Sequence, residues 1–475
     1  MIVRTSLKVA VLACFAGLAG CDDGKAELDE QVRYWLEYHA VQPIEVEASD
    51  IKSPEAQLGK LLFFSLSLSG NDKVACVSCH HPDIGGDDDL PLSVGVNVAI
   101  PESIGRDRVS LLGRPMVPRN APTTFNSSLW QRRMFFDGRV ERINSLDDPR
   151  PEISTPDEKF GDVDLTATSL LQAQAGFPVV SEHEMRETYE NEASNERVRA
   201  LLVQNLIDDV KTDLVLDPAR VSWDELFAQV YGVPADTSPS DLITMSRVQD
   251  LLAAYQSSQV FVNNPWQRYL RGDKSAISEG AKRGAVLFMK PVAQGGAGCY
   301  ECHSGDLFSD EDFHVLAVPH AGKGKDEREA DTGRFLRTGI FDDRFSFRTP
   351  SLLNVELTAP YGHSGVFSDL EGIIRHHLNP LESARNFDYE AAALLQPGIA
   401  HPKAAVFTEM AIAHLQNLQK SGQSKIRPQT LSDNDIELLI AFIKAQTDPC
   451  AESVTCLAPW KPDPAGPNPG GSLLY

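Results

Sequence analysis

The sequence predicts a mainly α-helical protein with long loops, divided into two domains. Three observations predict this fold class. Apolar residues recur at helical spacing in several segments, no segment is rich in strand-forming residues, and the pentapeptide Cys-x-x-Cys-His occurs once in each half of the chain. The chain has 475 residues, which is enough for two or three domains with separate cores.

The first half contains helical segments separated by irregular regions. A short helix is expected over residues 56–64, just before the first pentapeptide, and another over residues 242–260. Between them, one helix face is formed by Val198, Leu201, Leu202, Leu206 and Val210. The region that follows the first pentapeptide, up to about residue 165, is dense in Pro, Gly, Asp and Asn, which predicts irregular loops.

The second half has a clearer pattern. Ser278 can cap a helix that leads to the second pentapeptide, and its apolar face is formed by Ala281, Ala285 and Phe288. Near the end, Ser432 and Asp435 form a capping box before a last helix. That helix has apolar residues at positions i, i+3, i+4 and i+7, namely Ile436, Leu439, Ile440 and Ile443. The segment 272–274 (Gly-Asp-Lys) marks a boundary after the helix expected over residues 242–260.

The two pentapeptides carry the chemistry. They are Cys76-Val77-Ser78-Cys79-His80 and Cys299-Tyr300-Glu301-Cys302-His303. Two thiols at this spacing add across the vinyl groups of one porphyrin, and the adjoining His supplies the proximal iron ligand. The alternative is a four-cysteine zinc site, but zinc does not require His at the same offset twice. We therefore expect two covalently bound haem c groups, each in a cytochrome c-like domain made of a helix, the pentapeptide loop and a closing helix.

The N-terminus has the pattern of a secretion signal. Arg4 and Lys8 precede the apolar run 9–18, and Leu18-Ala19-Gly20-Cys21 follows. This tetrapeptide resembles the lipobox of bacterial lipoproteins, in which cleavage leaves a lipidated Cys21. The alternative is an ordinary secretory signal with a free Cys behind it. We expect a signal peptide over residues 1–20, an acidic tether over 21–50, and a periplasmic protein held to a membrane by its lipid alone.

The formal net charge of −23 argues against nucleic-acid binding. Once the signal, the lipidation site and the haem thioethers are assigned, Cys450 and Cys456 remain, and in an oxidising compartment we expect them to form a disulfide. They lie in a Pro- and Gly-rich tail, residues 448–475, which is expected to lie outside both cores.

Further motifs surround the pentapeptides. They are Arg119–Asn126 (RNAPTTFN), Phe135–Arg139 (FFDGR), Asn264–Asp273 (NPWQRYLRGD), Arg348–Leu352 (RTPSL) and Leu357–Gly365 (LTAPYGHSG). In this order they resemble the motifs of the bacterial di-haem cytochrome c peroxidase / MauG family. The resemblance implies two cytochrome c-like domains packed face to face, residues 51–265 and 266–447. It also implies that the N-terminal haem reacts with hydrogen peroxide and that the C-terminal haem relays electrons.

The resemblance implies an acid/base pair above the first haem. In the family a Gln and a Glu ten residues apart, with a Pro between them, serve this purpose, and Gln174, Pro178 and Glu184 reproduce that spacing. Glu184 would move the proton and Gln174 would hydrogen-bond the bound oxidant. The alternative is that residues 182–184 (Glu-His-Glu) form a solvated charge cluster, with His183 as a bystander.

Many members of the family block the first haem with a distal His, and the corresponding position here is Val96. His81 lies too close to the proximal ligand to reach across the porphyrin. We therefore expect an open iron at His80. At the second haem, the family places a distal ligand nineteen residues after the Thr of the Leu-Thr-x-Pro motif, which here is His377. His376 is the competitor, or both are surface residues. Two His ligands predict a low reduction potential.

The resemblance also implies a calcium ion between the domains, held by the side chain of Asn120 and the carbonyls of Thr358 and Pro360. These residues could instead simply form a turn. The family's inter-haem Trp is replaced by Phe136, and Trp130 lies six residues earlier, so Trp130 or another aromatic residue is a candidate to fill the gap.

The function expected is a peroxidase that takes electrons from a small cytochrome c or cupredoxin. One alternative is the MauG-like oxidation of residues on a partner protein. His377 and the unblocked first haem favour this alternative, whereas Phe136 weakens it. The other alternative is a non-enzymatic electron carrier or haem sensor. Gln174 and Glu184 oppose it, because a carrier needs no acid/base group above an open iron.

Overall fold

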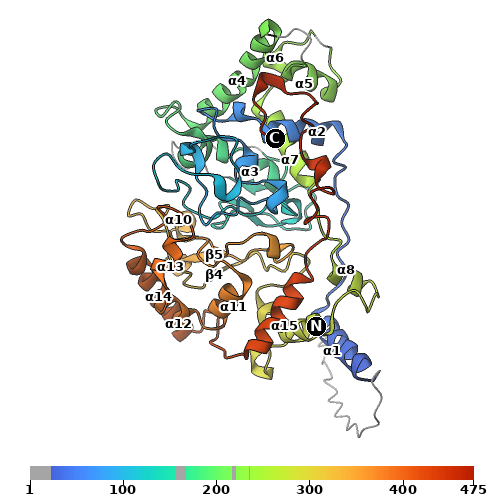
Figure 1. Ribbon diagram of the computed structural model, residues 1–475, viewed down its shortest axis with the longest axis vertical. Helices are drawn as coiled ribbons and strands as arrows, with labels where there is room; N and C mark the ends of the chain where they lie inside the picture. The colour runs from blue at the N-terminus through green and yellow to red at the C-terminus, as the bar shows by residue number, and fades with distance from the viewer. Residues whose placement is uncertain (1–22, 156–166, 217–220, 235) are drawn as a thin grey trace, which may run out of the picture.

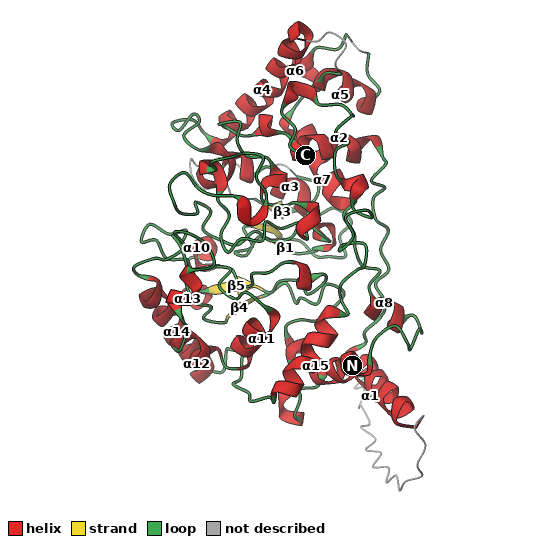
Figure 2. Cartoon of the chain, in the orientation of Figure 1, coloured by secondary structure: helices red, strands yellow, loops and turns green. Residues whose placement is uncertain are grey.

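The computed structural model describes residues 23–155, 167–216, 221–234 and 236–475. The described chain is mainly helix and loop, with five very short strands (Figures 1 and 2). The N-terminal half contains α2 (Pro54–Phe64), α3 (Leu170–Ala175), α4 (Asn195–Leu216), α5 (Trp223–Tyr231), α6 (Pro239–Leu242), α7 (Met245–Ser257) and the strands β1 (Arg133–Met134), β2 (Val140–Arg142) and β3 (Ile153–Ser154). The mainly α fold class is thus confirmed.

The C-terminal half forms the lower part of the molecule in Figure 1. It contains α8 (Pro265–Leu270), α9 (Glu279–Met289), α10 (Phe335–Thr338), α11 (Leu370–Leu378), α12 (Pro380–Arg385), α13 (Tyr389–Ala393), α14 (Ala404–Lys420), α15 (Asp433–Lys444) and the strands β4 (Phe313–Val315) and β5 (Ser346–Arg348). Helix α1 (Asp23–His39) lies beside this half.

Each half is built around one close helix pair. In the first half, α2 packs along α7, and a Cβ on Gly59 would lie 1.9 Å from the carbonyl oxygen of Leu251. In the second half, α9 packs along α15 in the same way, and a Cβ on Gly284 would lie 1.9 Å from the carbonyl oxygen of Leu438. Glycine is required at both crossings because only a residue without a Cβ allows the backbones to approach so closely. The caps expected at Ser278 and Ser432 are present.

The segment assigned to an acidic tether is different in the structure. Most of it forms α1, which packs against α9 and buries Leu28, Val32 and Trp35. Asp29 anchors the helix by accepting hydrogen bonds from Lys282 and Tyr269, both at 2.7 Å. The three apolar residues are spaced i, i+4 and i+7, a helical stripe that the acidic composition of the segment obscures.

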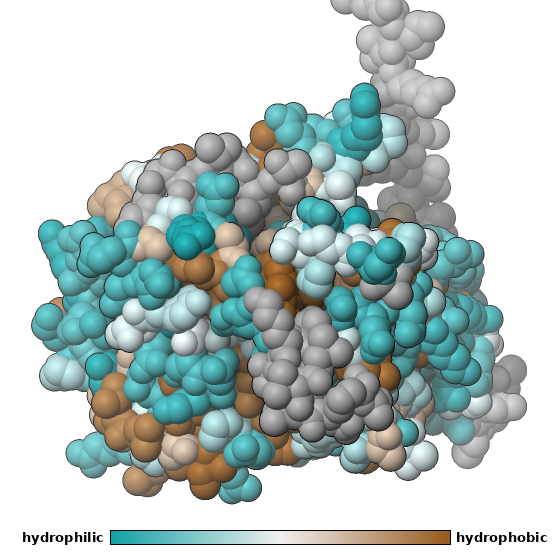
Figure 3. Space-filling view, turned by 90° about the horizontal axis from the view of Figure 1, so that it is seen from above, coloured by the Kyte–Doolittle hydropathy of each residue, from teal (hydrophilic) through white to brown (hydrophobic). Residues whose placement is uncertain are grey.

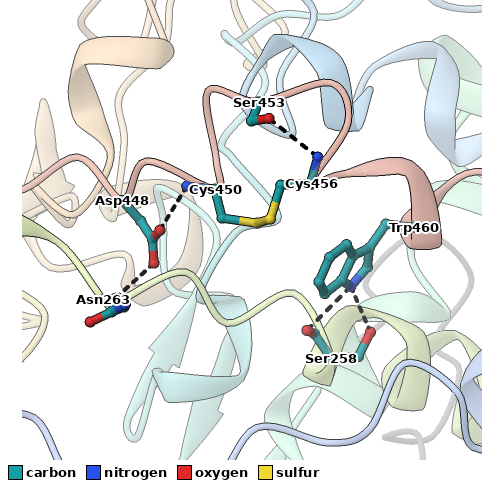
Figure 4. The surroundings of a disulfide bond; sticks show 7 residues. All are labelled: Ser258, Asn263, Asp448, Cys450, Ser453, Cys456 and Trp460. Atoms are coloured by element: carbon teal, nitrogen blue, oxygen red, sulfur yellow. Dashed lines mark hydrogen bonds between the residues drawn. A yellow bond between two sulfur atoms is a disulfide. The ribbon is translucent and has the colours of Figure 1, made fainter.

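The prediction that the C-terminal tail lies outside both cores is wrong. The tail runs back to the first half, where Leu473 and Leu474 join the core and the Leu474 amide donates to the Phe64 carbonyl at 2.9 Å. A disulfide joins Cys450 and Cys456 at the start of this return, and Trp460 then donates to Ser258 (Figure 4). A single Leu-Leu pair has no periodicity, so the sequence pattern did not reveal its burial.

A buried ion-pair network ties the halves together. Arg119, from the first half, donates two hydrogen bonds to Asp331 of the second half, at 2.6 and 2.8 Å, and a third to Asp137 at 2.7 Å. Asp137 also accepts from Lys325 at 3.2 Å. The side chains of Arg119, Asp137 and Asp331 are at most 7% exposed, so each charge depends on its partners.

Arg119→Leu is expected to reduce the free energy of unfolding by about 3–5 kcal/mol, because it leaves Asp331 and Asp137 buried without their main partner. Urea denaturation followed by circular dichroism measures the change. Arg106→Leu is the matched control, since it removes an Arg–Asp pair whose side chains are 71% and 36% exposed, and it should cost less than about 1 kcal/mol. Equal effects of the two substitutions would contradict this role of the network.

The described surface is largely hydrophilic on the face drawn in Figure 3. Seen from above, hydrophilic residues cover most of the face, with smaller apolar groups between them (Figure 3). Within the described residues, no helix is long and apolar enough to cross a membrane.

Candidate haem sites

The first pentapeptide forms a short 3₁₀ turn (Cys76–Ser78) followed by Cys79 and His80. Nδ1 of His80 hydrogen-bonds to the carbonyl of Gly86 at 3.2 Å, which fixes the ring and leaves Nε2 for a metal. Burial lowers the pKa of His80 to about 4, so the imidazole is neutral, as a ligand must be. Val77 and Val96 are buried in the apolar core beside this turn.

Val96 occupies the position at which many family members have a distal His. It is 2% exposed, and its carbonyl accepts a hydrogen bond from Asn71 at 3.0 Å. His81 lies against Phe64, and its Nδ1 accepts from the amide of Asp83 at 3.2 Å, so this ring caps the next turn of the chain.

Gln174 and Glu184 lie on consecutive segments beside this site. Gln174 is in the last turn of α3, and Glu184 is in a π-helical turn, Glu182–Arg186. Met185, which follows Glu184 in this turn, belongs to the same apolar core as Val96. Both side chains are half-buried. The pKa of the Cys79 thiol is raised to about 12, first by burial and then by nearby negative charges that include Glu184. The Glu184 carboxylate therefore lies within electrostatic range of the first pentapeptide.

Arg186 holds the π-helical turn in place. Its fully buried side chain donates to the carbonyls of Tyr189, at 2.9 Å, and of Glu190. On the other side of the turn, the His183 carbonyl oxygen packs closely against Gly95. A Cβ on Gly95 would lie 2.0 Å from this oxygen. Glu184 is thus carried by a segment that is fixed at both ends, which suits a group that must hold one position above a reacting centre.

The second pentapeptide opens onto a cavity of about 310 Å³ whose wall includes Cys299, Cys302, His303 and His377. The rings of His303 and His377 face each other with their centres 6.2 Å apart. A metal–imidazole bond is about 2.0 Å long and a ring centre lies about 1.2 Å beyond its nitrogen, so two axial rings on one metal are about 6 Å apart. The separation of the two rings matches this value.

The ring nitrogens distinguish His377 from His376, its neighbour on α11. Nδ1 of His377 hydrogen-bonds to the Ile373 carbonyl at 2.8 Å, which leaves Nε2 as the nitrogen available for a metal, and the residue lines the cavity. His376 is fully buried, and both its nitrogens are bonded, to Ser383 Oγ at 3.0 Å and to the Leu316 carbonyl at 2.9 Å. The geometry favours His377 over His376 as the group that can reach a metal.

Both sites contain buried donors suited to the propionate groups of haem. Near Cys79, Nε and Nη2 of Arg108 and Oγ of Ser93 have no hydrogen-bond partner among the described residues. In the wall of the second cavity, the same holds for Nη1 of Arg348 and Nδ1 of His363. Buried donors normally have partners, and carboxylates are strong acceptors. The residues present therefore fit haem at both sites.

The three residues expected to bind calcium share one cavity. Asn120, Thr358 and Pro360 all line the second cavity. Asn120 uses its amide nitrogen to donate to the Leu90 carbonyl at 3.0 Å, so its side-chain oxygen is left as an acceptor. Asp87 lines the same cavity, and its Oδ2 has no partner among the described residues. The pattern did not single out Asp87, because its importance depends on burial rather than on spacing.

Between the two sites, Trp130 and Phe136 both line the second cavity. The guanidinium of Arg348 lies over the Trp130 ring, 3.5 Å from its centre. Trp130 also packs against the apolar cluster that contains α3 residues Leu170 and Leu171. Trp130 thus lies at the wall of the second cavity and packs against the apolar cluster to which α3 contributes.

Comparisons with known proteins agree with this arrangement. The family model described as di-haem cytochrome c peroxidase matches residues 53–275. The methylamine utilization protein MauG of Methylorubrum extorquens is 26% identical over 345 residues, which are 72% of this chain and 74% of that protein. The cytochrome c551 peroxidase of Nitrosomonas europaea is 26% identical over 369 residues, which are 78% of this chain and 83% of that protein.

Solved structures show the same fold. A MauG-like protein associated with microbial copper homeostasis is 21% identical and superimposes with a TM-score of 0.54 over 88% of this chain and 96% of its own. The di-haem peroxidase BthA from Burkholderia thailandensis is 18% identical, with a TM-score of 0.54 over 91% of this chain and 94% of its own. Residues 53–275 thus match the di-haem cytochrome c peroxidases, a family with two c-type haems, and the relatives identify the chain as an oxidoreductase of the cytochrome c peroxidase type.

Proposed function

We propose that the protein reduces hydrogen peroxide to water with electrons that a small cytochrome c or cupredoxin delivers through the C-terminal haem. The observation that carries this proposal is the unequal surroundings of the two proximal histidines. His303 faces a second imidazole at 6.2 Å, whereas Val96 takes the place of a distal ligand at the first site and Glu184 lies within electrostatic range of it. One site is built to handle electrons and the other to admit a substrate.

Haem c, when bound, supplies an iron that accepts electrons and reacts with peroxide. His80 and His303 would hold the two irons, and His377 would be the other ligand of the second. At the first site, Glu184 would take a proton from one peroxide oxygen and return it to the other, leaving oxygen, while the Gln174 amide would orient the substrate. Each turnover consumes two electrons and two protons, and two water molecules leave.

The MauG-like alternative, peroxide-dependent oxidation of residues on a partner protein, is favoured by the same pair, His303 and His377, since a low-potential second haem is a poor store of electrons. Rapid mixing separates the two functions. Ferric protein and peroxide are mixed with and without reduced cytochrome c. Fast oxidation of the cytochrome supports the peroxidase, and a long-lived oxidised protein without donor turnover supports partner oxidation. A protein that does not react with peroxide at all would be a carrier or sensor.

We further propose a periplasmic location with a lipid anchor at Cys21, which lies outside the described residues. The support is the lipobox-like sequence before it. Metabolic labelling with a fatty acid tests the anchor. The unmodified protein should incorporate the label, and the Cys21→Ser variant should not.

For the calcium site we propose that Asn120, Thr358 and Pro360 bind the ion and that Asp87 supports it with its charge. The pKa of Asp87 is raised well above its usual value by burial and then by Asp88, and a cation would relieve this cost.

Asp87→Asn is expected to weaken calcium binding by about 10- to 100-fold, the effect typical of outer-shell partners. Calorimetric titration of calcium-depleted protein measures it. The control is Asp88→Asn, a buried neighbour whose Oδ1 accepts from the Leu90 amide at 3.2 Å and whose charge acts on Arg108 and Cys79. Equal loss of affinity in both variants would contradict the assignment.

A further inference from the structure

A line of aromatic rings connects the second haem-binding pentapeptide with the molecular surface. Tyr300 lies between Cys299 and Cys302, and its ring is 4.3 Å from that of His39 at the end of α1. The His39 ring is 4.9 Å from Tyr38 and 6.0 Å from Trp35. Distances between ring centres in this range mean that the rings are in van der Waals contact.

The line continues to solvent. Trp35 is 5.0 Å from Tyr34 and 5.3 Å from Tyr38. Trp35 is 5% exposed, whereas Tyr34 and Tyr38 are 57% and 58% exposed. Three residues that can lose an electron, Tyr300, Trp35 and a surface tyrosine, are therefore joined through one bridging imidazole.

The bridge is held in place. Nε2 of His39 hydrogen-bonds to the Met289 carbonyl at 2.8 Å, at the end of the helix that leads to the pentapeptide. The packing of α1 on α9 and the hydrogen bonds of Asp29 fix the rest of the helix. Tyr300 is bonded through the backbone to Cys299, whose sulfur would form a thioether to the edge of the haem. The line thus begins at the haem attachment itself.

We propose that these residues form an electron relay from the exposed tyrosines of α1 to the second haem, and that it supplies electrons when peroxide arrives without a donor. The inference rests on the proposed reaction with peroxide. Each of two tyrosines gives one electron to the relay and one phenol proton to water, which leaves two neutral tyrosyl radicals. Peroxide takes up two electrons and two protons and leaves as two water molecules. The two radicals then couple by a carbon–carbon bond into a dityrosine.

The test uses ferric holoprotein and a few equivalents of hydrogen peroxide without reductant. Dityrosine fluorescence and peptide mass spectrometry locate the oxidised residues, and peroxide consumption is measured in parallel. Tyr475 is an internal control, since it is 50% exposed but lies at the C-terminus, in the half that carries the first site (Figure 1). We expect modification at Tyr34 and Tyr38 at least about fivefold above that at Tyr475.

Two variants interrupt the relay at different points. Trp35→Phe removes an oxidisable ring in α1, outside the haem-binding pentapeptide, and Tyr300→Phe removes one within it. Both should lower dityrosine formation severalfold while peroxide is still consumed, and Tyr389→Phe, on α13, should have no effect. Peroxide consumed with Tyr34 and Tyr38 unmodified, or modified no more than Tyr475, would overturn the relay alone. If peroxide is not consumed at all, the proposed function fails, and the relay with it.

Discussion

Glu184→Gln is expected to slow peroxide reduction by about 10²- to 10⁴-fold, the contribution typical of a well-placed general acid/base. Glutamine keeps the shape and the hydrogen-bonding capacity of the side chain but cannot carry a proton between the two peroxide oxygens. Both haems should remain attached, because Cys76, Cys79 and their partners are untouched. Steady-state oxidation of reduced cytochrome c by peroxide measures the loss, and the absorption spectrum checks the haem content.

Glu182→Gln is the matched control, since it removes a carboxylate from the same π-helical turn. It should change the rate by less than about threefold, because the ten-residue spacing from Gln174 assigns the acid/base role to Glu184, whose charge, after that of Asp88, raises the Cys79 pKa. A Glu184→Gln protein with the rate of the unmodified protein would show that the acid/base assignment is wrong. The solvated charge cluster would then be the correct interpretation of residues 182–184.

His377→Met is expected to raise the reduction potential of the second haem by on the order of 0.1 V or more, because a thioether stabilises ferrous iron better than imidazole does. The 6.2 Å separation of the His303 and His377 rings is the basis of this expectation. Spectroelectrochemical titration resolves the two haems and measures the shift. The first haem, in the other half, should keep its potential.

His376→Gln is the control for this experiment. Both nitrogens of His376 already have protein partners, and glutamine can replace these hydrogen bonds, so the potential should not move. A second variant, His377→Gly, should lose the low-spin signal of the second haem and regain it when imidazole is added. If His377→Met leaves the potential unchanged, His377 is not the ligand.

Much of the candidate site was predictable because it depends on local spacing. A Cys-x-x-Cys-His loop brings its own three groups together in any fold, and a helical segment that begins at Leu370 places His377 one turn beyond Ile373. The caps at Ser278 and Ser432 are local in the same sense. These features need no knowledge of what the rest of the chain does.

Features that depend on distant contacts could not be predicted in this way. Arg108 lies in a loop-rich segment, and only the fold shows that its guanidinium is buried near Cys79. The packing of α1 against α9 is likewise non-local, since the stripe of Leu28, Val32 and Trp35 is hidden among acidic residues. The tail was misassigned for the same reason, because two leucines acquire a core position only when the chain returns to α2.

The two haems are expected to differ, with an open iron at His80 and a closed one between His303 and His377. Electron paramagnetic resonance of the resting ferric protein tests this difference directly. We expect one high-spin signal from a haem with a free coordination position and one low-spin signal typical of two imidazole ligands, in equal amounts. A resting protein in which both haems are six-coordinate and low-spin would contradict this expectation.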